Sequence, residues 1–303
     1  MVRKHARRAV KAAFALALAI PIVLGGTAYA KTTAKPTIVV GTKNFTEAFV
    51  LGQLYKQALE AKGFKVGYKE NIGSSELLDT ALTSGKINFA PEYTGILALN
   101  LARVKPAPKS AAATFAAAKR FEEKRGFTLL KQTPFFDADS FAVLKTTAKK
   151  YGLKKISDLT KVPNLSYAGY PECDKRITCL LGLKQIYGLK KIKFVQLGTI
   201  PVTKLIDQGK VTGGDIFTTE PAFATGKYVA LIDDKHIFGF QNVAPVVSKK
   251  IVAAHGAKFV SAVNAVSAKL TNAAMIAMNK AVAIDKKTPA AVAKAFLQAN
   301  GLL

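Results

Sequence analysis

The chain has 303 residues, of which 45 are Lys or Arg and 19 are Asp or Glu, so its formal net charge at pH 7 is +26. Half of the residues are hydrophobic, and this length is enough for two domains with real cores. The basic residues occur as scattered pairs and triplets, such as Lys190-Lys191-Lys193, without interleaved aromatic residues. This pattern indicates a solubilising lysine surface and argues against a nucleic-acid partner.

The first thirty residues have the order of a secretory signal peptide. Five basic residues open it: Arg3, Lys4, Arg7, Arg8 and Lys11. An apolar run over 12–24 and the small-x-small string Ala28-Tyr29-Ala30 follow. The run is too short and alanine-rich for a convincing membrane span, and no cysteine follows the cleavage site, so no lipid anchor is expected. Cleavage after Ala30 would release a periplasmic protein whose charge, without the five leader positives, is +21.

Strand and helix patterns alternate along the next hundred residues. In order they are a strand at 37–40, a helix at 47–62, a strand at 65–69, a helix through 77–82, a strand at 87–90, a helix at 111–125 and a strand at 128–131. Gly or Ser stands at the turns after strands, which is typical of a mostly parallel sheet covered by helices. Ligands of such sheets bind at the carboxyl ends of the strands, where helix N-termini point their N–H groups.

A second α/β unit begins around Asp137-Ala138-Asp139. Its strands are expected at 140–144, 165–169, 193–196, 214–218 and 228–232, and its helices at 180–187 and 202–208. After His236 the chain returns through a strand at 244–247 and ends in helices at 259–270, 271–284 and 289–299. The sequence therefore predicts two α/β lobes, with lobe 1 formed by 31–138 and 241–303 and lobe 2 by the inserted segment 139–240. Two crossing segments would form a hinge.

Both cysteines of the chain lie in the string Pro171-Glu172-Cys173-Asp174-Lys175-Arg176-Ile177-Thr178-Cys179. In an oxidising compartment we expect Cys173 and Cys179 to form a disulfide. The small closed loop would hold Arg176 in a fixed place, which suits a guanidinium that receives an anionic group. The same disulfide would equally fit a purely structural clasp on a surface loop.

Several strings, in this order, are shared with a known family. They are Val40-Gly41-Thr42-Lys43-Asn44-Phe45-Thr46-Glu47, Asn71-Ile72-Gly73-Ser74-Ser75, Pro91-Glu92-Tyr93-Thr94-Gly95, Lys149-Lys150-Tyr151-Gly152-Leu153 and Asn242-Val243-Ala244-Pro245-Val246-Val247. From about residue 37 to the C-terminus the chain resembles the substrate-binding proteins of ABC importers for quaternary ammonium compounds such as glycine betaine, choline and carnitine. The cysteine loop resembles one branch of that family.

The resemblance implies the type II periplasmic-binding fold, in which a solute enters between two lobes, the lobes close, and the closed form docks on a permease in the cytoplasmic membrane. It implies no cofactor, and we expect a monomer. In the family a quaternary ammonium group lies among aromatic rings, because a methylated cation cannot donate a strong hydrogen bond. A solute carboxylate, where present, is received by Arg or Lys and by backbone N–H groups.

Matching residue by residue, Tyr93 lies where the family has a cage tyrosine, and Arg176 lies near the family's carboxylate-binding arginine. Asp139 replaces an aromatic residue, because Phe135-Phe136-Asp137-Ala138-Asp139 stands where many members carry Phe-Asn-Asn-Thr-Tyr. Phe45 and Phe136 could stand in for missing rings. The full set of expected ligand-binding residues is Asn44, Phe45, Thr46, Tyr93, Thr94, Asp139, Arg176 and Thr219.

This exchange of an aromatic residue for Asp139 leaves the solute open. The carboxylates of Asp139 and Glu220 would bind a cation through charge and would favour a solute with hydrogen-bond donors. Another cationic or zwitterionic solute therefore remains an alternative. Structural roles also fit, since Tyr93 would pack after a strand and Asp139 would cap a turn.

Other classes of function find less support in the sequence. His236 and His255 have no catalytic motif around them, and neither a G-x-S-x-G string nor a phosphate-binding loop occurs, so we do not expect an enzyme. His and Cys residues are not paired at metal-ligand spacing, so no metal site is expected. A solute sensor built on the same two lobes remains an alternative that the sequence does not separate from import.

Overall fold

The first of two five-stranded sheets has the strand order β2-β1-β3-β10-β4 in a computed structural model that describes Met1 and residues 35–303. The expected cleavage site lies outside the described residues. The strands of this sheet are β1 (Ile38–Gly41), β2 (Val66–Lys69), β3 (Phe89–Tyr93), β4 (Phe127–Leu129) and β10 (Val243–Ser248). β1 runs parallel to β2 and β3, whereas β10 runs antiparallel to β3 and β4. Four strands therefore share one direction and β10 is reversed.

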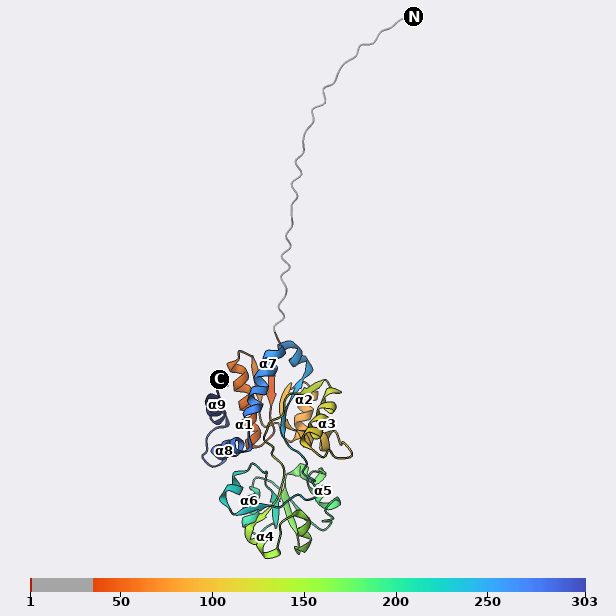
Figure 1. The fold of residues 1–303 in the computed structure, drawn as a ribbon, viewed down its shortest axis with the longest axis vertical. Helices are drawn as coiled ribbons and strands as arrows, with labels where there is room; N and C mark the ends of the chain where they lie inside the picture. Colours follow the sequence, from red (N-terminus) through yellow and green to blue (C-terminus); the bar gives the residue numbers. More distant parts are fainter. Residues whose placement is uncertain (2–34) are drawn as a thin grey trace. The chain divides into compact units, whose positions relative to one another are not determined.

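Helices cover both faces of the first sheet (Figure 1). Their bounds are α1 (Thr46–Ala61), α2 (Ser75–Thr83), the π-helix Ile96–Leu101, α3 (Ala111–Glu123), α7 (Lys249–Lys269), α8 (Asn272–Ala283) and α9 (Pro289–Ala299). Successive strand residues point to opposite faces. Phe89 and Val243 accordingly pack in the core with α1, α7, α8 and α9, while Ala90 and Ala244 pack with α2 and α3. This two-sided burial explains why the strands read as continuous apolar runs.

Helix α7 is the one helix in the described part of the chain that is long and apolar enough to cross a membrane. Its residues Phe259, Val263 and Val266 are fully buried in the core shared with α1, so it reads as a core helix of this lobe. The backbone at Gly256 has φ +66°, which kinks the helix near its start. The prediction placed the helix start at 259, ten residues after the observed start at Lys249, because the pattern is interrupted at this glycine.

The second sheet has the order β7-β6-β8-β5-β9. Its strands are β5 (Phe141–Leu144), β6 (Ser166–Gly169), β7 (Lys193–Gln196), β8 (Gly213–Asp215) and β9 (Tyr228–Ala230), and its helices are α4 (Lys145–Tyr151), α5 (Leu180–Gln185) and α6 (Val202–Asp207). Short 3-10 helices cover Ile156–Lys161, Pro171–Lys175 and Pro221–Thr225. Phe141 and Tyr167 face the core with α5, whereas Ala142 and Ala168 face α6. β5 is the reversed strand here, antiparallel to β8 and β9.

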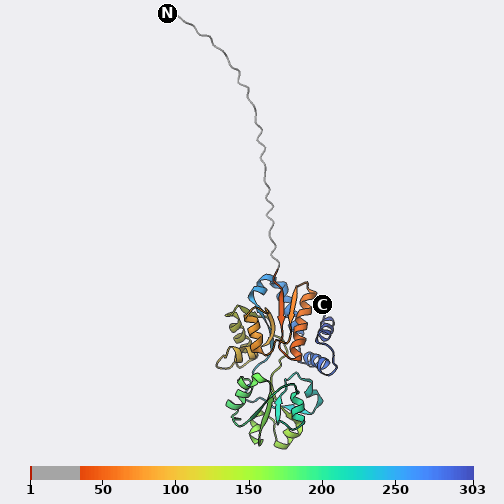
Figure 2. The same ribbon diagram turned by 180° about the vertical axis from the view of Figure 1, so that it is seen from behind.

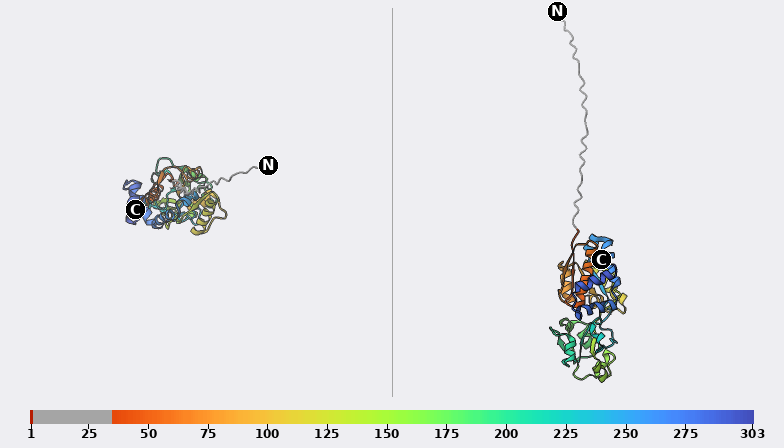
Figure 3. Two further views of the ribbon diagram at one scale, coloured as in Figure 1. Left: turned by 90° about the horizontal axis from the view of Figure 1, so that it is seen from above. Right: turned by 90° about the vertical axis from the view of Figure 1, so that its left-hand side faces the viewer.

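Residues 35–303 form one compact unit that holds both sheets. Helices α1, α2, α3, α7, α8 and α9 gather around the first sheet and α4, α5 and α6 around the second, both from behind and in the side view on the right of Figure 3 (Figures 2 and 3). The predicted α/β fold with mostly parallel sheets is confirmed. Each has a reversed strand, β5 or β10, and each of these is the first strand that the chain forms after passing from one sheet to the other.

Strand β3 extends to Tyr93, three residues beyond the predicted end. Proline lacks the N–H of a sheet ladder, so Pro91 argued for a strand end in the sequence. In the structure Pro91 faces Pro245 across the antiparallel pair β3–β10, so neither residue opposes a donor that needs a partner at that position. The extension carries Tyr93 to the carboxyl end of the strand. The π-helix, α4 and the 3-10 helices were not predicted.

Candidate functional site

Four aromatic rings form a row at the carboxyl ends of four strands, two in each sheet. Tyr93 ends β3, Phe45 follows β1, Phe217 follows β8 and Tyr170 follows β6. The ring centroids are 6.2 Å apart for Tyr93 and Phe45, 5.3 Å for Phe45 and Phe217, and 5.7 Å for Phe217 and Tyr170. Strand ends of this kind are the ligand-binding edge of α/β sheets, so the row marks the candidate site.

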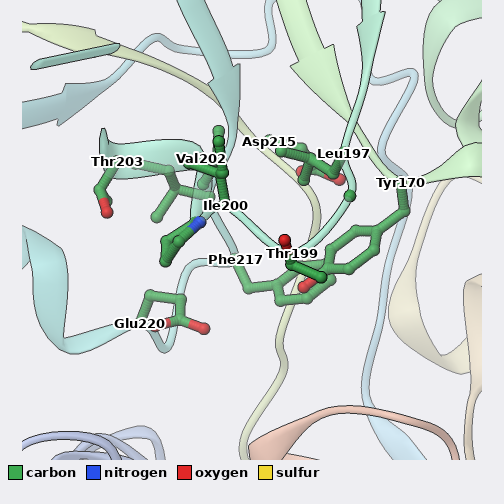
Figure 4. A pocket seen from close by; sticks show the side chains of 12 residues that line it. Tyr170, Leu197, Thr199, Ile200, Val202, Thr203, Asp215, Phe217 and Glu220 are labelled. Carbon is green, nitrogen blue, oxygen red and sulfur yellow. The ribbon is translucent and has the colours of Figure 1, made fainter. Parts of the chain in front are cut away.

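The larger cavity of the site has a volume of about 290 Å³ and lies against the second sheet. Tyr170 and Phe217, whose ring planes differ by only 8°, form one wall, and Glu220 lies across the opening with its carboxylate toward the rings (Figure 4). The loop 197–203 forms the remaining wall, and Asp215 lines the cavity at the end of β8. The carboxyl group of Glu220 forms no hydrogen bond with any residue that the structure describes, and its pKa is raised by burial and by the charge of Glu47.

Close packing of α6 on β8 shapes this wall. A Cβ at Gly214 would lie 2.2 Å from Val202 Cγ2 and 3.0 Å from the carbonyl oxygen of Ala168, so only glycine fits. The absence of a side chain lets α6 start directly over the sheet. Val202 and Thr203, the first residues of α6, thereby line the cavity.

The smaller cavity, about 30 Å³, adjoins the first sheet, and Phe217 lines both cavities. Phe45 and Tyr93 supply its other rings, and Asp137 and Asp139 supply two carboxyl groups. Gln241 completes the wall, with its amide satisfied by the backbone N–H of Ile96 and the carbonyl of Phe238. The two cavities together form a cleft between residues of the two sheets.

Lys43 already occupies one face of Tyr93. Its ammonium lies 4.0 Å from the Tyr93 ring centroid and 5.3 Å from that of Phe45, which is a cation–π arrangement. The same ammonium donates to Glu92 Oε1 at 3.0 Å and to Ser75 Oγ at 3.3 Å, and the side chain is buried. A cation that belongs to the protein therefore fills the position that the sequence led us to expect for a solute at Tyr93.

A buried network around Glu47 joins the two sheets. Tyr93 Oη donates to Glu47 Oε1 at 2.6 Å, and Thr219 Oγ1 and Asn279 Nδ2 donate to Oε2 at 2.6 and 2.9 Å. Burial raises the pKa of Glu47, although these donors favour its charged form. Burial also raises the pKa of Tyr93, and the neighbouring carboxyl group of Glu47 adds to this. Tyr93 thus has its hydroxyl fixed, and only 4% of its surface is exposed.

Three aspartates lie close together near Phe217. Asp137 accepts from the backbone N–H and the neighbouring hydroxyl at Thr219 and Thr218, and Asp139 is hydrogen-bonded to Asp215. Burial raises the pKa of all three, and the charge of Asp139 raises that of Asp215 further. Within the described residues, no group of three or more His, Cys, Asp or Glu side chains is arranged to hold a metal ion.

The disulfide between Cys173 and Cys179 is present, as the sequence led us to expect. The cysteine loop (Cys173–Cys179) carries Arg176 toward α2, where its Nε and Nη2 atoms lie 3.1 and 2.8 Å from Glu76 Oε1 and Oε2. Thr178 of the same loop accepts from Asn100 Nδ2 at 2.8 Å. Partial desolvation opposes ionisation of Glu76, but Arg176 outweighs it and lowers the pKa of Glu76 to about 2.

Comparisons with known proteins agree with this geometry. Residues 36–299 match the family described as the substrate binding domain of ABC-type glycine betaine transport system. The chain belongs to this glycine betaine family. The resemblance drawn from the sequence strings is thereby confirmed.

Individual relatives extend the match. The chain is 30% identical over 281 residues to a glycine-betaine-binding protein of Pseudomonas aeruginosa, covering 88% of this chain and 89% of that protein. It is 28% identical over 277 residues to the carnitine transport binding protein OpuCC of Listeria monocytogenes, covering 88% of each. A solved structure of a glycine betaine/carnitine/choline ABC transporter protein superposes with a TM-score of 0.71 at 22% identity, covering 88% of this chain and 99% of that one, which shows the shared fold.

The structure brings together three of the residues expected from the glycine betaine family, since Phe45, Tyr93 and Asp139 all line the smaller cavity. The other five line neither cavity. Asn44 is exposed, Thr46 starts α1, Thr94 donates to the carbonyl of Phe240, Thr219 binds Glu47 and Arg176 binds Glu76. Phe136, considered as a substitute ring, is 48% exposed and lies outside both cavities.

Residues outside the expected ligand-binding set line the larger cavity, and among them only Glu220 was considered from the sequence as a charge for a cation. Tyr170 and Phe217 supply its rings, and Asp215 and Glu220 supply its carboxyl groups. A usable signal existed for Tyr170 and Glu220, because each follows a predicted strand, where ligand contacts concentrate. Asp215 and Phe217 fell inside the strand predicted over 214–218, which in the structure ends at Asp215. The pairing of Tyr170 with Phe217 left no local pattern, since the two residues are far apart in the chain.

Proposed function

We propose that the protein is the extracytoplasmic solute-binding component of an ABC importer. It captures a quaternary ammonium osmoprotectant of the glycine betaine or choline kind between its two lobes and delivers it to a permease in the cytoplasmic membrane. Family membership and the glycine betaine and carnitine proteins among its relatives support this role. The row of four rings that ends at the larger cavity is the structural observation that carries it.

The chemistry of the larger cavity suits a methylated cation. A trimethylammonium group has no N–H to donate, so π faces and a nearby negative charge are its best partners. Tyr170 and Phe217 offer the faces and Glu220 the charge. A volume of about 290 Å³ is at the lower end of the usual range for small-molecule sites, as expected for a solute of few heavy atoms.

The organisation of the molecule follows from this role. We assign lobe 1 to residues 31–138 and 241–303 and lobe 2 to 139–240, with the segments before β5 and before β10 as the hinge. The protein acts as a monomer in the periplasm after cleavage behind Ala30. Phe45 and Asp139 contact the solute together with Tyr170, Phe217 and Glu220. Four further residues stabilise the walls of the cleft without lining either cavity: Asn44, Thr46, Thr94 and Thr219.

The test is a calorimetric titration of the purified periplasmic protein with glycine betaine, choline, carnitine and proline betaine. We expect tight binding of at least one, and the solute recovered afterwards is chemically unchanged because the protein performs no reaction on it. Phe217→Ala removes the ring shared by the two cavities. Loss of a desolvated cation–π contact of about 1–2 kcal/mol weakens binding roughly 5- to 30-fold.

Phe121→Ala is the matched control, because it deletes a phenyl ring of the same size on α3 that lines neither cavity. Its affinity should equal that of the unmodified protein. Equal weakening by the two substitutions would contradict the assignment of the aromatic row. A sensor role, the alternative from the sequence, predicts the same binding but no loss of solute uptake when the gene is deleted.

A further inference from the structure

The cleft is acidic on a strongly basic protein. Asp137 and Asp139 line the smaller cavity, and Asp215 and Glu220 line the larger one. Among the described residues that line the two cavities there is no Lys, Arg or His, although the chain has 45 basic residues and only 19 acidic ones. Such a wall offers a positively charged solute four carboxyl groups and offers a solute carboxylate no cation.

The two cations whose charges act on Asp139 are already paired within the protein. Lys43 binds Glu92 and lies against the Tyr93 ring. Arg176, the residue expected to receive a solute carboxylate, makes a two-pronged contact with Glu76, and only 13% of its side-chain surface is exposed. Redirecting Arg176 to a solute would break two charge-assisted hydrogen bonds, which are among the stronger contacts in proteins.

The rings and the carboxyl groups of the larger cavity act in the same direction. Tyr170 and Phe217 present π faces, which attract a cation and repel an anion. Glu220 lies beside them without a hydrogen-bonding partner among the described side chains. A solute hydroxyl can donate to such a carboxylate, whereas a solute carboxylate placed there meets a like charge in a partly desolvated cavity.

We infer that the cleft selects cations that lack a carboxylate, such as choline, over zwitterions such as glycine betaine and carnitine. The inference rests on the proposed function and narrows its solute class. It separates this chain from the glycine betaine and carnitine proteins to which it is similar. The discrimination comes from repulsion between the carboxyl groups of the cleft and the carboxylate of the zwitterion, rather than from extra attraction for the cation.

The test compares choline with glycine betaine by calorimetry on the periplasmic protein. The two solutes share the trimethylammonium group and differ in whether a hydroxymethyl or a carboxylate follows it. We expect choline to bind at least about 10-fold more tightly, which corresponds to about 1.4 kcal/mol. Glu220→Gln keeps the size of the side chain but removes its charge, so the ratio should fall through weaker choline binding and unchanged or tighter glycine betaine binding.

Glu60→Gln on the exposed side of α1 is the matched control, since it makes the same chemical change far from both cavities and should leave the ratio unchanged. Glycine betaine binding as tightly as choline overturns the inference while the proposed function stands. Binding of a carboxylate-free amine such as agmatine, with no methylated ammonium bound, keeps the inference and overturns the quaternary ammonium part of the function. Binding of neither kind overturns both.

Discussion

Asp139 and Asp215 show how single residues set the charge of the cleft. The two carboxyl groups are hydrogen-bonded to each other, and burial raises the pKa of both. Neighbouring like charges do not both ionise readily, so burial and mutual repulsion favour the protonated form of this pair. Arg176 and Lys43 oppose this rise for Asp139, while Glu172 adds to it, and Asp137 adds to that of Asp215.

This pair predicts a pH-dependent affinity. A carboxyl group below its raised pKa is neutral and attracts a cation weakly, and above it the group is charged. Bound cation favours the charged form, so affinity should rise as pH rises through these raised values, and binding should release protons. Titrations at a series of pH values above the ordinary pKa of an aspartate, in buffers of different ionisation enthalpy, measure that release. Asp139→Asn should reduce the dependence, with Asp215, Asp137 and Glu220 supplying what remains, whereas a flat profile in the unmodified protein would contradict the coupling.

The resemblance identified Phe45, Tyr93 and Asp139 as cleft residues, because each belongs to a string with a fixed place in the family. The resemblance did not predict that Lys43 covers one face of the Tyr93 ring or that Arg176 binds Glu76. Those contacts join residues of different strings, and a one-dimensional pattern does not show which charges pair. Tyr170 was missed for the same reason, since its partner Phe217 is supplied by a distant strand end.

At the scale of elements, the cysteine loop (Cys173–Cys179) belongs to the part of the chain that forms the second sheet, and it contacts helices that pack on the first sheet. Arg176 reaches Glu76 in the first turn of α2, and Thr178 reaches Asn100 in the π-helix Ile96–Leu101. The disulfide restricts the conformational freedom of the loop, so Arg176 and Thr178 are both positioned for these contacts. We expect the loop to stabilise the closed arrangement of the lobes and to make no contact with the solute.

A double-mutant cycle on Arg176→Ala and Glu76→Ala tests this role. Glu76 is 45% exposed, so solvent screening limits the coupling to about 1 kcal/mol, or about fivefold in affinity. The loss should be equal for choline and for glycine betaine, because the pair touches neither. A loss confined to carboxylate-bearing solutes would instead make Arg176 the receptor that the sequence led us to expect.

The same pair has a defined pH range. The folded-state pKa of Glu76, about 2, lies below the ordinary value of 4.5 for a glutamate. The contribution of the ion pair to the free energy of unfolding is therefore fully present above about pH 4.5. It is lost as pH falls from there toward 2. The Arg176–Glu76 pair loses its contribution below the ordinary glutamate pKa, whereas burial moves the pKa of Asp139 and Asp215 upward, so the two effects shift in opposite directions along the pH scale.

At the scale of the whole molecule, both sheets have five strands, one of them reversed, and the carboxyl ends of strands from both sheets lie at a common cleft. Alternation of strand and helix patterns predicted both sheets and their order along the chain, because each pattern is local. The reversed strands β5 and β10 were not predicted, since direction depends on how the chain returns from the other sheet. The hydrogen bond from Thr219 to Glu47, which joins residues 172 positions apart, likewise has no local signature.

A crystal structure of the protein grown with choline tests most directly whether a quaternary ammonium solute is captured between the lobes. We predict the trimethylammonium group against the rings of Tyr170 and Phe217, its hydroxyl directed to Glu220, and Lys43 still on the face of Tyr93. A solute bound against Tyr93 with Lys43 displaced, or bound outside the two cavities, would contradict the account.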